Sequence, residues 1–206
     1  MILKQVLEIH DLIDRADASG EKLKAFFEER GAKNVTVTKI TGKEGSTDFI
    51  KIVIPGRNGK TNGGDAPTLG VIGRLGGVGA RPAVTGYVSD GDGAVAALSV
   101  ALKLTDMQNF GDILEGDVIV TTHICPNAPT EEHYPVPFMG SPVDMDQMNE
   151  SEVLSEMDAI LSIDTTKGNE IINCRGFAIS PTVKSGYILP VSYDLLQVMK
   201  RVTGRM

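Results

Sequence analysis

Three aspartates are the first residues in this sequence whose types and positions could do chemistry. Asp90 and Asp92 stand in the phrase DGDGAVAALSVALKL, just before an alanine- and leucine-rich stretch, 94–104, that is typical of a buried helix. Asp164 follows the apolar phrase AILSI, which predicts a buried strand. Carboxylate oxygens are ligands for divalent cations, so these aspartates indicate a metal site if the fold brings them together.

A second group of reactive side chains follows the apolar phrase DVIVTT, residues 117–122, which also predicts a strand. His123 and Cys125 come directly after this phrase, and Glu131 and Glu132 lie in the proline-rich segment beyond it. Imidazole and thiolate groups bind zinc, and histidine or glutamate can act as a general base. The group therefore offers further ligands for a divalent metal ion.

Ligand sites in open α/β sheets lie outside the carboxyl ends of the strands, and both groups are expected there. The sequence thus predicts one divalent metal ion, with zinc as the first expectation. The predicted metal ligands are Asp90, Asp92, His123, Cys125 and Asp164.

Each of these residues also has a purely structural interpretation. Aspartates before a helix are most often N-terminal caps, and a single histidine at a strand end is more often a hydrogen-bonded structural residue than a ligand. Cys125 fits equally well as a small buried hydrophobic residue, and Asp164 as the first residue of a turn. Glu131 and Glu132 are most simply solvated loop residues. Spacing alone leaves both interpretations open.

The elements that must position these side chains follow from apolar periodicity. Two helices are expected first, the second capped by Ser19 and ended by Gly31. An antiparallel pair over 34–40 and 48–55 follows, then a loop over 56–67 that packs against nothing. The remaining expected elements are strands at 68–72, 117–122, 159–163 and 177–183, helices at 94–104 and 192–201, and a proline-rich loop at 126–143. This order predicts an α/β fold with a central, mainly parallel sheet flanked by helices.

Composition restricts the class of protein. The 206 residues suit one α/β domain spanning 1–206, and 41% hydrophobic residues exclude a disordered chain. The net charge of −7 comes without a basic run, which argues against a nucleic-acid partner. No apolar stretch approaches the ~20 residues of a membrane span, and the first residues lack a signal peptide, so we expect a cytoplasmic protein. Cys125 and Cys174 are then expected as free thiols.

Several phrases resemble the co-catalytic zinc peptidases of the glutamyl-aminopeptidase type. The aspartate that bridges the two metals in those enzymes precedes a glycine and an alanine-rich helix, as Asp90 does, and a later ligand aspartate ends a phrase similar to AILSIDTT, as Asp164 does. The resemblance implies a zinc-peptidase-like fold. It departs where those enzymes have a metal histidine, because Arg74 stands there, and where they have a catalytic Glu-Glu pair, near His123. The resemblance therefore implies that another base activates the water, and the predicted catalytic residues are His123, Glu131 and Glu132. We expect Arg74 to pair with Asp90 or Asp164.

The chain as a whole more closely resembles the family called domain of unknown function 1177. The phrases STDFIKIVIPG, GDAPTLGVIGRLGG, THICPNAPT and PFMGSPVDM are among those that support this resemblance. Members of that family are longer, so the resemblance implies that a C-terminal part is missing here. A sheet without its last strands would expose apolar residues beside Ile160 and Ile163, and we therefore expect a homo-oligomer.

The residues and the resemblance together predict a metal-dependent hydrolase that cleaves an amide bond in a small peptide or amino-acid derivative. The alternative is a non-catalytic binding or regulatory protein that kept the fold, because this sequence lacks several catalytic groups of the enzymes that it resembles. A third option is a thiol enzyme that uses Cys125 with His123, two residues apart on one strand face.

Overall fold

The computed structural model describes residues 2–74, 76–80, 84–134, 138–165, 170, 173, 176–184 and 186–205. The chain divides into two compact units, residues 1–165 and 166–206. The expectation of one domain over 1–206 stays a prediction. All the predicted site residues lie in the first unit.

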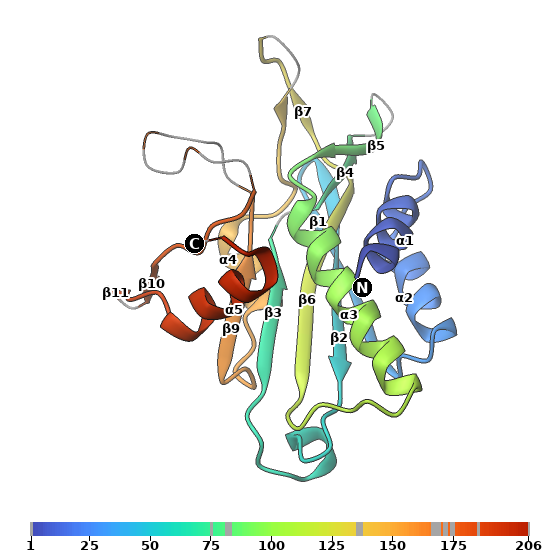
Figure 1. Cartoon of the computed structure of the whole chain (residues 1–206). Helices are drawn as coiled ribbons and strands as arrows, with labels where there is room; N and C mark the ends of the chain where they lie inside the picture. The colour runs from blue at the N-terminus through green and yellow to red at the C-terminus, as the bar shows by residue number, and fades with distance from the viewer. Residues whose placement is uncertain are drawn as a thin grey trace. The chain divides into compact units, whose positions relative to one another are not determined.

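A mixed sheet forms the centre of the first unit (Figure 1). Its main path runs β1-β2-β6-β3-β9, with β1 (Asn34–Gly42) and β2 (Gly45–Ile54) antiparallel as expected. Strand β6 (Val118–Asn127) runs antiparallel to β2 but parallel to β3 (Leu69–Gly73), and β3 runs parallel to β9 (Ala159–Ile163). The α/β class is confirmed, while β6, β3 and β9 are the strands that pair in parallel among those that the structure describes.

Helices α1 (Leu3–Ile13), α2 (Gly20–Glu29) and α3 (Asp92–Asn109) cover one face of this sheet (Figure 1). The main apolar core lies between them and includes Ile9, Phe27, Leu98, Ile52 and Val120. Ser19 caps α2 by accepting a hydrogen bond from Lys22 N, and Gly31 follows α2 with a φ of 95°, as the sequence predicted.

The opposite face of the sheet is covered by α4 (Met145–Glu152), which the sequence analysis did not predict. Side chains alternate between the two faces along a strand, so the odd-numbered residues of β6 face α4. The apolar packing on this side consists of two small clusters, one around Phe49, Val143 and Met148, the other around Ile72, Ile119 and Met157.

The remaining strands of the first unit are short. Strands β4 (Gly77–Ala80) and β5 (Val84–Ser89) form an antiparallel pair joined to the end of β6. The proline-rich segment is less irregular than expected, because it contains a small hairpin of β7 (Thr130–Glu131) and β8 (Phe138–Met139). Strand β9 ends the sheet path, with Ile160 41% exposed, so self-association stays a prediction.

The second unit contains a hairpin of β10 (Thr182–Lys184) and β11 (Tyr187–Leu189), and helix α5 (Tyr193–Thr203). Helix α5 ends at Gly204, whose φ is 71°, so the predicted final helix is confirmed with boundaries two residues or fewer from those expected. No helix in the described part of the chain is long and apolar enough to cross a membrane.

The loop after β2 packs against the rest of the chain, although the sequence analysis predicted that it packs against nothing. It folds around the buried carboxylate of Asp117, which accepts hydrogen bonds from Gly56 N at 2.8 Å, Thr61 N at 2.8 Å and Thr61 Oγ1 at 2.9 Å. A short 3-10 turn, η1 (Lys60–Asn62), forms where Asp117 binds the chain. The prediction was wrong because a polar loop can be ordered by a carboxylate far away in the sequence.

The N-terminus of α3 lies directly against the carboxyl ends of β3 and β9. A Cβ atom on Gly93 would overlap the carbonyl oxygens of Arg74 and Ile163. Arg74 N in turn donates to Ile163 O at 2.8 Å. Only glycine permits this approach, which places the first turn of α3 at the edge where the predicted site residues gather.

We predict that Gly93→Ala destabilises the protein by about 2 kcal/mol, because the added methyl group forces α3 away from the strand ends. Helix propensity alone would instead predict that Gly93→Ala increases the free energy of unfolding by about 1 kcal/mol. Urea unfolding of the two proteins measures the difference. A more stable Gly93→Ala protein would show that α3 does not approach the strands so closely.

We predict that Asp117→Ala lowers the free energy of unfolding by about 2 kcal/mol at neutral pH, through loss of hydrogen bonds to a charged acceptor. Burial tends to raise the pKa of Asp117, but the hydrogen bonds from Gly56 and Thr61 outweigh it and hold the pKa below its usual value of 3.8. The contribution is therefore present above pH 3.8 and disappears as the pH falls through the lowered pKa. Urea unfolding at several pH values measures it, with Asp112→Ala, in the exposed loop after α3, as the control.

Candidate functional site

Three polar residues occupy equivalent positions at the carboxyl edge of the parallel strands. Thr122 of β6 and Ile163 of β9 both pair with Gly73 of β3. The next residues along these strands are His123, Asp164 and Arg74, respectively. The structure therefore brings one basic, one acidic and one imidazole side chain level with the carboxyl end of β3, close to where open α/β sheets bind ligands.

A carboxylate from α4 joins two of these residues. Glu152 Oε2 accepts a hydrogen bond from Arg74 Nη1 at 2.5 Å, and Glu152 Oε1 lies 2.5 Å from His123 Nδ1. Glu152 is 0% exposed and His123 is 1% exposed. A buried carboxylate is stable only when its oxygens are paired. Both oxygens of Glu152 have such a partner, and an ionised Glu152 accepts from His123 in the tautomer that carries its proton on Nδ1.

Arg74 lies along the inner side of α4. Its guanidinium contacts Asn149 Oδ1 and lies 3.9 Å from Met145 Sδ, in addition to its ion pair with Glu152. Residues 145, 149 and 152 share one face of a helix, so the side chain of Arg74 contacts α4 in both its first and its last turn. The expected pairing of Arg74 with Asp90 or Asp164 was wrong, because the side chain points to the α4 face of the sheet and is neutralised by Glu152.

Cys125 lies on the same face of β6 as His123. Its Sγ is 3.2 Å from Thr47 Oγ1, and it is one of the buried residues under the α4 side of the sheet. Burial raises the pKa of the Cys125 thiol to about 11, and the charges of Asp48 and Glu152 add smaller increases. The hydrogen bond between the thiol and Thr47 opposes this rise. The thiol is therefore protonated at neutral pH, which does not suit a nucleophile.

The acidic residues gather at the N-terminus of α3. Thr165 connects two of them, because Thr165 Oγ1 donates to Asp92 Oδ2 at 3.2 Å and Thr165 N donates to Asp164 Oδ1 at 2.8 Å. Asp90 lies in the turn between β5 and α3. Burial raises the pKa of Tyr87, and the negative charges of Asp92 and Asp90 raise it further.

Asp90 does not cap α3. The N-cap is Gly91, which has no side chain, and Asp90 stands one residue before it with a φ of 42°. An aspartate in this left-handed region costs of order 1 kcal/mol. Asp92 occupies the first helical position, where a negative charge is stabilised by the helix dipole. The turn therefore presents exposed carboxylates at the carboxyl edge of the sheet.

The other predicted site residues lie in separate surroundings. Glu131 and Glu132 are exposed on β7 and directly after it, and the described contacts of His123 are with Glu152 and Phe49. Cys174 lies outside the described residues. Within the ranges that the structure describes, no three His, Cys, Asp or Glu side chains form a group that could hold a metal ion. The metal ligands and catalytic residues inferred from the sequence stay predictions.

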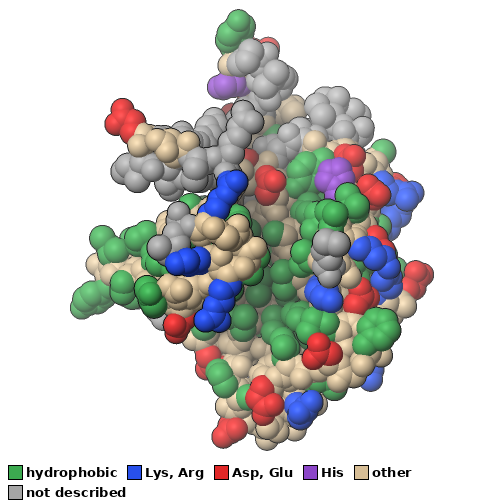
Figure 2. Space-filling view, viewed as in Figure 1, with side chains coloured by type: hydrophobic (Ala, Val, Ile, Leu, Met, Phe, Trp, Pro, Cys, Tyr) green, Lys and Arg blue, Asp and Glu red, His purple; other side chains and the backbone are tan. Residues whose placement is uncertain are grey.

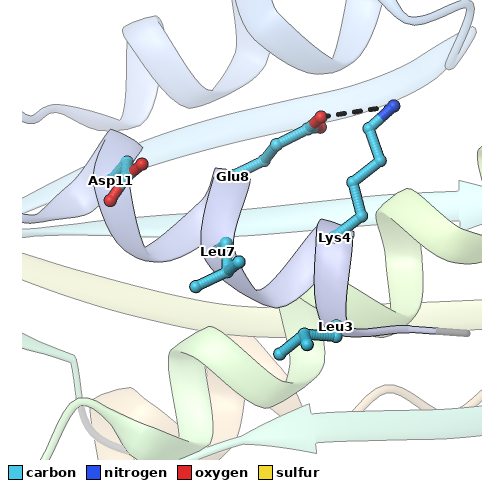
Figure 3. A pocket seen from close by; sticks show the side chains of 5 residues that line it. All are labelled: Leu3, Lys4, Leu7, Glu8 and Asp11. Carbon is cyan, nitrogen blue, oxygen red and sulfur yellow. Dashed lines mark ion pairs between the residues drawn. The ribbon is translucent and has the colours of Figure 1, made fainter.

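The surface over α1 offers little for binding. A shallow depression is lined by Leu3, Lys4, Leu7, Glu8 and Asp11, all from α1, and Lys4 and Glu8 form an ion pair across it (Figure 3). Over α1, α2 and α3, basic side chains are interspersed with acidic and hydrophobic ones (Figure 2). These features indicate an ordinary solvated surface.

The sequence analysis missed Glu152 and the helix that contains it. A signal was present, because Asp144 and Gln147 stand three residues apart and form a reciprocal capping box at the start of α4. Met145, Met148 and Glu152 also recur at helical spacing. Recognising that helix would have added Glu152, on its buried face, to the candidate residues.

Comparison with protein-family models shows a match to the family described as "Protein of unknown function (DUF1177)", over residues 38–206. It begins within β1 and leaves α1 and α2 outside. No curated protein matches the chain.

We predict that Arg74→Met destabilises the protein by about 3 kcal/mol or more, since it leaves Glu152 buried and charged beside one remaining partner. Adding Glu152→Gln in the same protein should recover part of this loss, because the unpaired charge is then gone. Urea unfolding of the wild type, both single variants and the double variant measures the coupling. Arg57→Met, at an exposed position, is the control, and additive single effects would contradict the ion pair.

Proposed function

We propose a function for this chain, which belongs to the DUF1177 family, from its own geometry, because the description of that family assigns no reaction. The function is that of a metal-dependent hydrolase acting on an amide bond of a small peptide or amino-acid derivative. A divalent ion would be held at the carboxyl edge by Asp92 and Asp164.

The observation that supports this proposal is the link through Thr165. Asp92 begins α3 and Asp164 follows β9, yet one threonine donates hydrogen bonds to both carboxylates. Two carboxylates suit a divalent ion that completes its coordination with water or substrate oxygens. The exposed position at a parallel-strand edge also leaves room for such ligands.

Each participant would have a distinct role. A bound divalent ion polarises a carbonyl oxygen and makes its bound water more acidic. Asp92 and Asp164 hold that ion, and Thr165 orients both carboxylates through its hydrogen bonds. The close packing of Gly93 against Arg74 O and Ile163 O keeps the start of α3 next to the end of β9.

A second candidate function is non-catalytic binding, and the pairing of Glu152 favours it. Both Arg74 and His123 donate to this buried carboxylate, so neither is available as a free catalytic group in this conformation. Such an edge could bind a ligand without transforming it.

We predict that the wild-type protein binds Zn²⁺, Mn²⁺ or Mg²⁺ in isothermal titration calorimetry after treatment with a chelator. Asp92→Asn and Asp164→Asn should each weaken binding by about tenfold or more, since each removes a charged ligand. Asp112→Asn makes the same change at an exposed position after α3 and should leave the affinity unchanged.

Hydrolysis of a set of N-acetylated dipeptides by the metal-loaded protein then separates the two candidates. Turnover that Asp164→Asn abolishes supports the hydrolase. Metal binding without turnover of any amide would favour the binding protein. Equal metal affinity in the wild type and Asp164→Asn would remove the proposed site altogether.

A further inference from the structure

The contacts of Glu152 have the form of a carboxylate bound in a receptor site. Its two oxygens are engaged separately, Oε2 by the guanidinium of Arg74 and Oε1 by the imidazole N–H of His123. Arg74 directly follows β3 and His123 lies in β6, whereas the carboxylate belongs to the last residue of α4. Arginine and a second N–H donor converging on one carboxylate are a common means of recognising an anionic group.

We propose that Arg74 and His123 form a binding site for the carboxylate of a small ligand, and that Glu152 occupies this site as an internal, autoinhibitory ligand. The inference does not depend on the metal ion proposed above, because it rests on different residues. It identifies a ligand chemistry, a carboxylic acid, and a segment, α4, that must move for the ligand to enter.

The position of the site supports a binding role. Arg74 follows the last residue of β3, and His123 is the first residue of β6 beyond its parallel pairing with β3, close to where ligands of open α/β sheets bind. Arg74 is 18% exposed, so the guanidinium already reaches the surface of the protein. A ligand carboxylate could thus approach the arginine first and then replace Glu152.

The attachment of α4 is compatible with such a movement. The helix has eight residues, too few to be stable by itself in water. Its buried apolar contribution is Met148, which packs with Phe49 and Val143. Helix α3, in contrast, buries Ala94, Leu98 and Leu102 in the main core. Segments with few buried apolar contacts open at a lower free energy than the core.

The polar contacts of α4 do not make up for its small number of buried apolar contacts in holding the helix on the sheet. A buried ion pair typically adds little net stability, because desolvation offsets the attraction between the charges. Thr121 Oγ1 also donates to Glu152 O at 2.9 Å, a neutral hydrogen bond of modest strength. A ligand that supplies its own carboxylate would keep Arg74 and His123 paired while α4 leaves, so that release of the helix costs little.

The test begins with Glu152→Ala, which removes the internal carboxylate and leaves both donors. We expect the variant to have a lower Tm that rises saturably with sodium acetate, with sodium chloride at equal ionic strength as the control. Glu150→Ala, an exposed change on the same helix, should show no acetate response. Adding Arg74→Met to Glu152→Ala should weaken acetate binding by about thirtyfold or more.

A larger carboxylate distinguishes a ligand site from a structural ion pair. We expect N-acetylglycylglycine to bind Glu152→Ala at least as tightly as acetate does. Its binding should speed hydrogen exchange at the amides of α4 and leave those of α3 unchanged. If acetate restores the Tm but N-acetylglycylglycine does not bind, the cavity is closed to ligands and Glu152 is a structural counter-ion, which overturns the proposal.

The wild-type protein gives the same test without a variant, should Glu152→Ala fail to fold. N-acetylglycylglycine should accelerate hydrogen exchange of the α4 amides in proportion to its concentration, because it competes with Glu152. The methyl ester of the same dipeptide lacks the carboxylate and should have no effect. Equal exchange with the acid and the ester overturns the proposal, and neither result bears on the metal ion.

Discussion

The pairing of the Glu152 carboxylate is the interaction on which the arrangement at the carboxyl edge depends. A fully buried charge is costly without partners, and Arg74 and His123 provide them from two neighbouring strands. The same pairing determines where α4 lies, since Arg74 also contacts Asn149 and Met145. The three charged or polar groups are therefore interdependent, and losing one leaves another unpaired in the interior.

The two faces of the sheet have different roles because they are built from different side chains. The face under α1, α2 and α3 buries a continuous apolar core, and hydrophobic burial is the main source of stability. The face under α4 contains Thr47, Thr121, His123 and Cys125 among small apolar clusters. Polar groups that contribute little net stability are concentrated where the sheet edge could bind a ligand.

Local sequence signals predicted most of the fold. Apolar alternation identified β1 and β2, Ser19 and Gly31 marked the ends of α2, and the alanine-rich run identified α3. These signals are reliable because capping and periodicity involve residues a few positions apart. The loop around Asp117 was misjudged because its partners are 56 and 61 residues away. The sequence analysis missed the β4–β5 pair and α4 because their sequences have no strong apolar periodicity.

The candidate site divides in the same way between sequence and tertiary structure. The sequence by itself determined which acidic residues end the strands and begin α3, and the fold places Asp92 and Asp164 on either side of Thr165. Only the tertiary structure decided the partner of Arg74. Glu152 is 78 residues from Arg74 and 29 from His123, so their contact depends on strand order, register and the sheet face that α4 covers. A residue's type reveals what it can bind, but the cost of burying an unpaired charge selects its partner only after the chain has folded.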